Sequence, residues 1–177
     1  MSLHRTSLLA AALLSGTVLA HIGHGQTMAA HDPAKAPQST ELKVTIDDKS
    51  VTLTLAALAA MPPKTVTVHN EHTKADETYT GVALGELLSR QGFSVGQATH
   101  RRMLRSYIKA EGTDNYWVLY SVTEVETSEH AGDVLVATSV NGRPLEDDGH
   151  LKLVDSADKK PQRWVRNLTA ITLVTVD

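Results

Sequence analysis

The chain has 177 residues, room for one ordinary domain, because single domains span roughly 100–200 residues. Hydrophobic residues make up 41% of it and charged residues 21%, which excludes a chain too polar to form a core. Lys and Arg number 17 against 20 Asp and Glu, and aromatic residues are only 4%. This composition lacks both the basic field and the stacking aromatics of nucleic-acid-binding proteins. We expect a globular domain that does not bind nucleic acid.

The N-terminal residues carry the pattern of a secretory signal. Residues 8–20 form an apolar run that is too short to cross a bilayer, which needs about 20 residues. The run ends in small residues of the kind that a signal peptidase reads. We therefore expect a signal peptide over residues 1–20, a flexible linker over residues 21–40 and a folded domain over residues 41–177. The mature protein is then periplasmic or secreted, without a transmembrane segment.

The rest of the sequence predicts many strands and a few short helices. Alternating or β-branched apolar residues predict strands at residues 42–46, 51–55, 64–69, 107–110, 116–120, 134–140, 151–153 and 168–176. Short helices are expected after a cap at Thr54, from Leu84 to a stop at Gly92, and at a capping box in residues 121–124. The predicted fold class is therefore α+β with strands in the majority.

Four short motifs follow one another along this region. They read YTGVALGELL at residues 79–88, GTDNYWV at 112–118, NGRPL at 141–145 and KKPQRWVR at 159–166. In this order they resemble the molybdopterin-binding domain of the sulfite oxidase family, and in particular its small exported bacterial members. The resemblance covers roughly residues 41–177. It implies a strand-rich fold with a mixed or barrel-like sheet.

The resemblance also implies a pterin pocket beside the last motif, with Lys160, Gln162, Arg163 and Trp164 on its wall. Four cations stand within residues 159–166, and Arg and Lys pair well with the phosphate of a pterin cofactor. The alternative is a structural role. Basic residues before a final strand often lie on a solvated sheet edge, and Trp164 then belongs to the core.

The expected metal ligand is missing from this sequence. Catalytic members of the family hold molybdenum through a Cys thiolate that follows the strand corresponding to residues 64–69, whereas this chain has no Cys at all. The corresponding position falls near residues 68–70, so His69 is our candidate metal ligand. A neutral imidazole does not donate as a thiolate does. This departure argues against oxygen-atom transfer, and the lack of Cys also excludes disulfides.

Other clusters of chemical interest have equally plain structural interpretations. Residues 21–31 hold three His that, with a new N-terminal amine, could chelate copper, or are simply polar linker residues. His69 and His72 form a second candidate metal pair, although their spacing at a strand end rarely aims both rings at one ion. The basic run at residues 99–105 is either an anion site or a solvated connector.

Two functions from different classes follow. In the first, the domain retains molybdopterin and serves a periplasmic redox reaction with a separate electron-transfer partner. In the second, the fold has lost the cofactor and binds a small ligand or a partner protein without catalysis. The missing Cys favours the second hypothesis, and the basic motif at residues 159–166 favours the first.

Overall fold

The computed structural model describes residues 37–71, 73–94, 99–126, 130–146 and 149–176. The expected signal peptide, most of the expected linker, the three His of residues 21–31 and His72 lie outside the described residues. Within the described residues, no helix is both long enough and apolar enough to cross a membrane.

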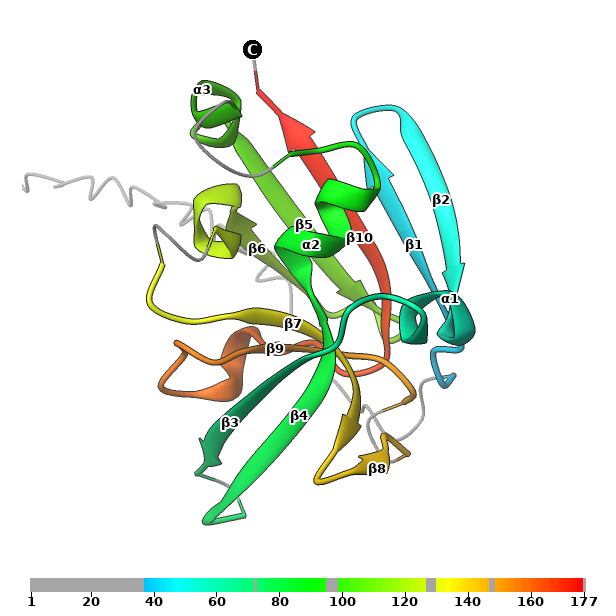
Figure 1. Cartoon of the computed structure of the whole chain (residues 1–177), viewed down its shortest axis with the longest axis vertical. Helices are drawn as coiled ribbons and strands as arrows, with labels where there is room; N and C mark the ends of the chain where they lie inside the picture. The colour runs from blue at the N-terminus through cyan, green and yellow to red at the C-terminus, as the bar shows by residue number, and fades with distance from the viewer. Residues whose placement is uncertain (1–36, 72, 95–98, 127–129, 147–148, 177) are drawn as a thin grey trace, which may run out of the picture.

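Strands dominate the described chain (Figure 1). They are β1 Glu41–Ile46, β2 Lys49–Thr54, β3 Lys64–Asn70, β4 Ala75–Ala83, β5 Ser106–Gly112, β6 Trp117–Ser121, β7 Val134–Val140, β8 Arg143–Pro144, β9 Lys152–Asp155 and β10 Leu168–Thr175. The α-helices are α1 Leu55–Ala59, α2 Leu84–Arg90 and α3 His100–Met103, and two 3₁₀ turns are η3 Val122–Val125 and η4 Pro161–Arg163. The predicted α+β class is confirmed.

The strands form two sheets. The first has the order β2-β1-β10-β5-β6, and the second has the order β3-β4-β7-β8 with β9 also paired to β7. The first sheet is mixed, because β1 pairs with β10 in parallel while its other pairs are antiparallel. The barrel-like alternative is wrong, since the described strands leave both sheets open. One physical reason is β8, which has only two residues and ends at Pro144, a residue that cannot donate to a further strand.

Local sequence signals explain most of the short helices and turns. The Thr54 hydroxyl accepts a hydrogen bond from the Ala57 amide at 3.1 Å and so caps α1, as predicted. Ser121 and Glu124 form the predicted capping box at η3. Gly92 follows α2 with a left-handed φ of 93°, which confirms it as the helix stop. The sequence did not predict α3 in the basic run, nor the strands β4 and β8.

The core has two parts that share β7. The larger part lies between the sheets and combines α2 with the inner faces of β1, β5, β10 and β7, where Val134 and Val136 contribute. The smaller part lies on the other face of the second sheet and includes Leu135, Tyr79 and Trp164. Successive β7 residues therefore enter different parts of the core, which explains why this strand is apolar almost throughout.

The last residues of the predicted linker contact the domain. The Gln38 side-chain amide donates to the Glu146 carbonyl at 3.0 Å, and the Ser39 amide donates to the Asn167 side chain at 3.2 Å. Ser39 itself is buried. These contacts place the chain just before β1 in the packed structure and beside β8.

We expect Gly81→Ala to destabilise the fold by about 3 kcal/mol. A Cβ at Gly81 would lie 2.0 Å from the Val136 carbonyl oxygen, so β4 and β7 would have to separate at the irregular register between Thr80 and Gly81. The matched control is Gly142→Ala, where φ is +75° but nothing lies within 4 Å, and where we expect a cost of about 1 kcal/mol. Chemical denaturation of both variants measures the difference, and equal costs would contradict the close-approach argument.

Candidate functional site

A polar cleft of about 820 Å³ opens at the end of the second sheet. One wall comes from the β3–β4 hairpin with Asn70 and Glu77, and the facing wall comes from the chain around β8. Figure 1 shows these two hairpins side by side at the lower end of the molecule. The floor between them is formed by Tyr79, Lys152 and Trp164.

Lys152 is the distinctive residue of this floor. Its side chain is only 5% exposed, although it lines an open cleft. The ammonium nitrogen donates to the Tyr79 hydroxyl at 3.1 Å and lies 5.0 Å and 5.4 Å from the ring centroids of Tyr79 and Trp164. The two rings meet edge to face at 5.7 Å. The aromatic faces thus stabilise a buried positive charge that would otherwise be costly to remove from water.

Glu77 lies at the other end of this hydrogen-bonded chain. It accepts from the Tyr79 hydroxyl at 2.6 Å, from the Asn70 side-chain amide at 2.9 Å and from the Thr73 hydroxyl at 3.2 Å. Burial acts to raise the pKa of Glu77, but these hydrogen bonds and the charge of Lys152 lower the pKa below its ordinary value overall. Lys152, Tyr79 and Glu77 therefore form one ordered polar network along the cleft.

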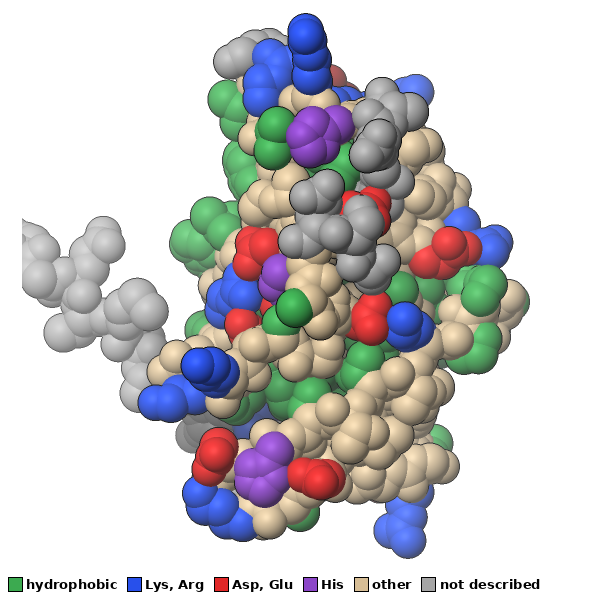
Figure 2. All heavy atoms as spheres, turned by 60° about the vertical axis from the view of Figure 1, so that its left-hand side comes forward, with side chains coloured by type: hydrophobic (Ala, Val, Ile, Leu, Met, Phe, Trp, Pro, Cys, Tyr) green, Lys and Arg blue, Asp and Glu red, His purple; other side chains and the backbone are tan. Residues whose placement is uncertain are grey.

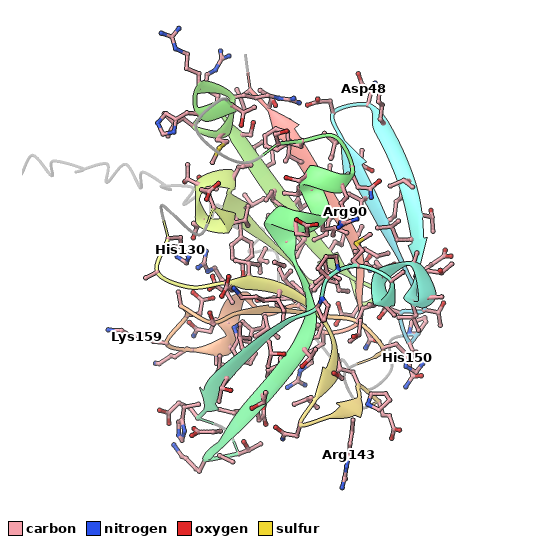
Figure 3. All side chains as sticks on the ribbon, viewed as in Figure 1. Asp48, Arg90, His130, Arg143, His150 and Lys159 are labelled. Atoms are coloured by element: carbon pink, nitrogen blue, oxygen red, sulfur yellow. The ribbon has the colours of Figure 1, made fainter. Side chains whose placement is uncertain are left out.

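The cleft lining carries charges of both signs, with three cations and two carboxylates among the described residues. Arg143 and Arg166 join Lys152 on its lining, against the carboxylates of Glu77 and Glu146. The stick view shows Arg143 extending from β8 at the lower end of the molecule (Figure 3). Arg and Lys side chains around one concave site suit a ligand with phosphate or carboxylate groups. The site can bind and orient an anion.

The structure separates the four residues predicted to form a pterin pocket. Trp164 lines the cleft and is buried in the smaller core, where its Nε1 donates to the Asp155 carbonyl at 3.1 Å. Lys160 and Gln162 are exposed and are not part of the cleft lining. The Gln162 carbonyl instead accepts a hydrogen bond from the Tyr116 hydroxyl.

Arg163 is held in an ion-pair network away from the cleft. Its guanidinium contacts Asp158 at 2.7 Å, Glu124 at 2.7 Å and the fully buried Asp155 at 3.1 Å, and it lies 4.5 Å from the centroid of the Tyr120 ring. The hydrogen bond with Asp158 raises the pKa of Arg163, while burial raises the pKa of Asp155. These partners give Arg163 a structural role in joining β9, η3 and η4.

The cations of the last motif therefore do not all line the cleft. Among residues 159–166, Arg166 reaches the cleft, Arg163 is paired within the fold, and the two Lys are not part of the cleft lining. Figure 3 shows Lys159 on the left flank of the molecule, well apart from Arg143 at the lower end. The sequence motif thus combines one cleft residue with a structural ion pair.

His69 does not point into the cleft. Alternate residues of β3 face opposite sides, so His69 is exposed while its neighbour Asn70 lines the cleft. The His69 Nδ1 lies 2.8 Å from the Asp76 carboxylate on the adjacent strand. The described residues contain no group of three or more His, Asp or Glu that could hold a metal ion. With no Cys in the chain, the described residues do not fit a molybdenum ion.

The sequence analysis missed Lys152, Tyr79, Glu77 and Asn70 as site residues. One signal was present, because Lys152 interrupts the apolar run of residues 151–154 that predicts a buried strand. A charged residue in such a strand is rarely buried unless it is paired or functional. Asn70 and Glu77 carried no comparable signal, since only the pairing of β3 with β4 brings them together.

The described domain shares its fold with part of a known enzyme. It superimposes on the sulfane dehydrogenase SoxCD from Paracoccus pantotrophus with a TM-score of 0.59 and 19% sequence identity, over 77% of this chain. The aligned part is only 38% of that chain's length. No protein-family model matches the sequence, and neither does any curated protein. At this identity the likeness establishes the fold alone.

Replacing Arg163 with Met is expected to destabilise the fold by about 3 kcal/mol, because it leaves the buried carboxylate of Asp155 without its cation. The control is Lys160→Met, which removes an exposed cation and is expected to change the free energy of unfolding by less than about 0.5 kcal/mol. Urea denaturation at neutral pH compares the two. An equally mild effect at both positions would show that the Arg163 network is dispensable.

Tyr79→Phe should raise the pKa of Glu77 toward its ordinary value, since the variant loses the shortest hydrogen bond to that carboxylate. In the native protein the lowered pKa means that ionised Glu77 stabilises the fold above its unfolded pKa, and this stabilisation disappears as the pH falls through the folded pKa. The variant should therefore lose less stability on acidification. Carbon-13 NMR titration measures the pKa, and Tyr107→Phe, on the first sheet, should leave it unchanged.

Proposed function

We propose that this protein is a non-catalytic binding module on a sulfite-oxidase-type fold, and that its cleft binds a small anionic ligand. The observation that carries the proposal is Lys152, a cation buried on the floor of an open polar cleft. The missing Cys and the outward position of His69 argue against a bound catalytic metal.

The position of Lys152 supports a binding role over a purely structural one. A Lys that served packing alone would be better replaced by an apolar residue, because burying an ammonium group carries a desolvation cost. Tyr79 and Trp164 hold its side chain in one place, so a ligand would meet an ordered cation. Arg166 is exposed on the same lining and can close over the anion.

The cleft wall formed by the β3–β4 hairpin favours some anions over others. Glu77 carries a negative charge at neutral pH and holds the Asn70 and Thr73 side chains by hydrogen bonds. A ligand would therefore place its anionic group near Lys152 and Arg166 and a neutral or hydrogen-donating part near Glu77. This charge separation favours a small polar molecule with an anionic end over a fully charged polyanion.

Retention of a pterin cofactor is the second candidate. The cleft volume of about 820 Å³ falls within the usual range for small-molecule and cofactor sites, and Trp164 and Arg166 belong to the motif that resembles the family's pterin pocket. Under this hypothesis Lys152 and Arg166 would hold the cofactor's phosphate, and a periplasmic electron-transfer partner would be required. The absence of a thiolate ligand makes this the weaker candidate.

Export to the periplasm is part of the proposal and rests on residues 1–20. Their short apolar run and small terminal residues are typical of a cleaved signal. A periplasmic location would bring the cleft into contact with small anions that enter the cell envelope.

The decisive experiment measures anion binding and cofactor content on the same protein. Mature protein is purified from the periplasm of a host that makes molybdopterin, and is assayed for molybdenum and for the fluorescence of oxidised pterin. Calorimetric titration then uses glycerol phosphate, which has one anionic end and a neutral hydroxyl-bearing end, and inorganic phosphate as probes. We expect neither molybdenum nor pterin, together with saturable binding of a probe.

The variant Lys152→Met should weaken probe binding at least about 10-fold, as should Arg166→Gln, whose exposed side chain can change without unfolding the domain. Lys160→Gln is the matched control outside the cleft lining and should bind as the native protein does. Near-stoichiometric molybdenum and pterin would replace this proposal with the second candidate. Equal binding by the Lys160 and Arg166 variants would remove the cleft as the binding site.

A further inference from the structure

A second surface of the molecule carries exposed apolar side chains. Five of the six large hydrophobic residues exposed in the described structure lie together on the outer face and end of the first sheet. We call them the apolar strip: Leu104 at 61% exposed, Tyr107 at 37%, Trp117 at 52%, Leu119 at 48% and Val176 at 54%. Contiguous exposed apolar surface of this kind is unusual on a soluble domain unless something binds there.

The strip follows from the alternation of β5 and β6. Ile108, Val118 and Tyr120 point into the core, so Tyr107 and Leu119 point outward. Leu104 and Val176 come from the ends of α3 and β10 and are brought together where the Val176 amide donates to the Arg105 carbonyl at 2.8 Å. Hydrophobic side chains appear along the left flank in the space-filling view, below basic side chains at the top (Figure 2).

Part of the strip lines a shallow, open groove. The groove has a volume of about 540 Å³ and runs between Leu104, Tyr107, Leu119 and Val176, with Arg105 on its rim. Such a groove suits an apolar side chain of an extended segment.

One long side of the strip is an open sheet edge. β6 ends the order β2-β1-β10-β5-β6, and no other described strand pairs with its outer side. An edge strand presents unpaired amides and carbonyls, to which an extended segment can add as a further strand. Backbone hydrogen bonds along β6 and side chains in the groove would then act together.

The charges beside the strip define the chemistry of the partner. Arg101 and Arg105 are exposed, and no described acidic side chain forms an ion pair with either. Two acidic side chains of this sheet are paired with other cations, Asp47 with Arg102 and Glu111 with Lys109. Arg101 and Arg105 therefore place exposed positive charge directly beside the strip, although the protein as a whole has a net charge of -3. Complementary charge selects an acidic partner.

We propose that the apolar strip binds an extended segment of a partner protein that carries alternating apolar residues followed by carboxylates. The segment would add to the edge of β6, place an apolar side chain in the groove, and direct its carboxylates toward Arg101 and Arg105. The surface lies on the first sheet, at the end of the molecule opposite the polar cleft (Figure 1). The binding therefore does not depend on the cleft's ligand.

An anionic membrane surface is the competing target of basic and apolar residues. One feature favours a protein segment. The open backbone edge of β6 finds no hydrogen-bond partner in lipid tails, but finds one in an extended chain.

The test uses two synthetic peptides as probes, each with alternating Val, Thr and Leu, one ending in three Glu and the other in three Lys. Trp117 is half exposed and Trp164 is buried, so a change in tryptophan fluorescence reports binding at the strip. We expect the Glu peptide to bind at least about 10-fold more tightly than the Lys peptide. Leu119→Ser and the double variant Arg101→Glu, Arg105→Glu should each weaken the Glu peptide by about 10-fold.

Matched controls come from the far side of the same sheet. Val51→Ser changes the sixth exposed hydrophobic residue, on β2, and Lys43→Glu reverses an exposed charge on β1. Both should change peptide affinity by less than about 2-fold. Equal affinity for the two peptides, or equal effects of control and strip variants, would overturn the proposal.

Two further measurements exclude the other occupants. The protein is tested for sedimentation with phosphatidylglycerol vesicles and, by light scattering, for a dimer. If either is seen and Leu119→Ser abolishes that behaviour, the proposal is overturned. The native protein should instead be monomeric and remain in solution with the vesicles. Lys152→Met tests whether the strip and the cleft are independent. It should leave peptide binding unchanged, so the anion-binding proposal and the peptide-binding proposal can fail separately.

Discussion

The burial of β7 on both faces is the constraint on which the rest of the structure depends. Its even-numbered residues complete the core between the two sheets, and its odd-numbered residues Leu135 and Ala137 begin a second, smaller core. A strand used in this way needs cover on both sides. One side is covered by α2 and the first sheet, while on the other side Trp164 and Leu145 pack beside residues of β3 and β4 that share the face. The polar cleft lies where that second cover ends.

The smaller core explains why a charged side chain is stable in the cleft. Tyr79 and Trp164 are held in the core, so their ring faces are fixed around the Lys152 ammonium group. The same Tyr79 hydroxyl then orders Glu77. The packing around β7 thus fixes the positions of one cation, Lys152, and one anion, Glu77, in the cleft. Mobile surface side chains would carry the same charges but would lose conformational entropy on binding a ligand.

The fold could be predicted from the sequence more fully than the candidate site. Alternation and caps predicted the strands β1, β2 and β7 and the cap at Thr54, because each signal is local. The site was harder to predict, because Arg163 and Arg166 differ in their partners and not in their chemistry. Asp155, Asp158 and Glu124 surround Arg163 only after β9 and η3 have been brought together. A run of cations in a sequence therefore cannot distinguish an internal ion pair from a ligand contact.

The fold and the site depend on different features of the sequence. The likeness to part of a sulfane dehydrogenase is a likeness of backbone arrangement, which depends on the apolar pattern and on turns such as Asn141-Gly142. The site depends on single side chains, and on β3 these alternate between the two faces. His69 lies outward against Asp76, while the inward residues Val66 and Val68 pack in the smaller core and Asn70 lines the cleft. A change at an outward position such as His69 would therefore leave the packing of β3 intact, so the same fold can carry different sites.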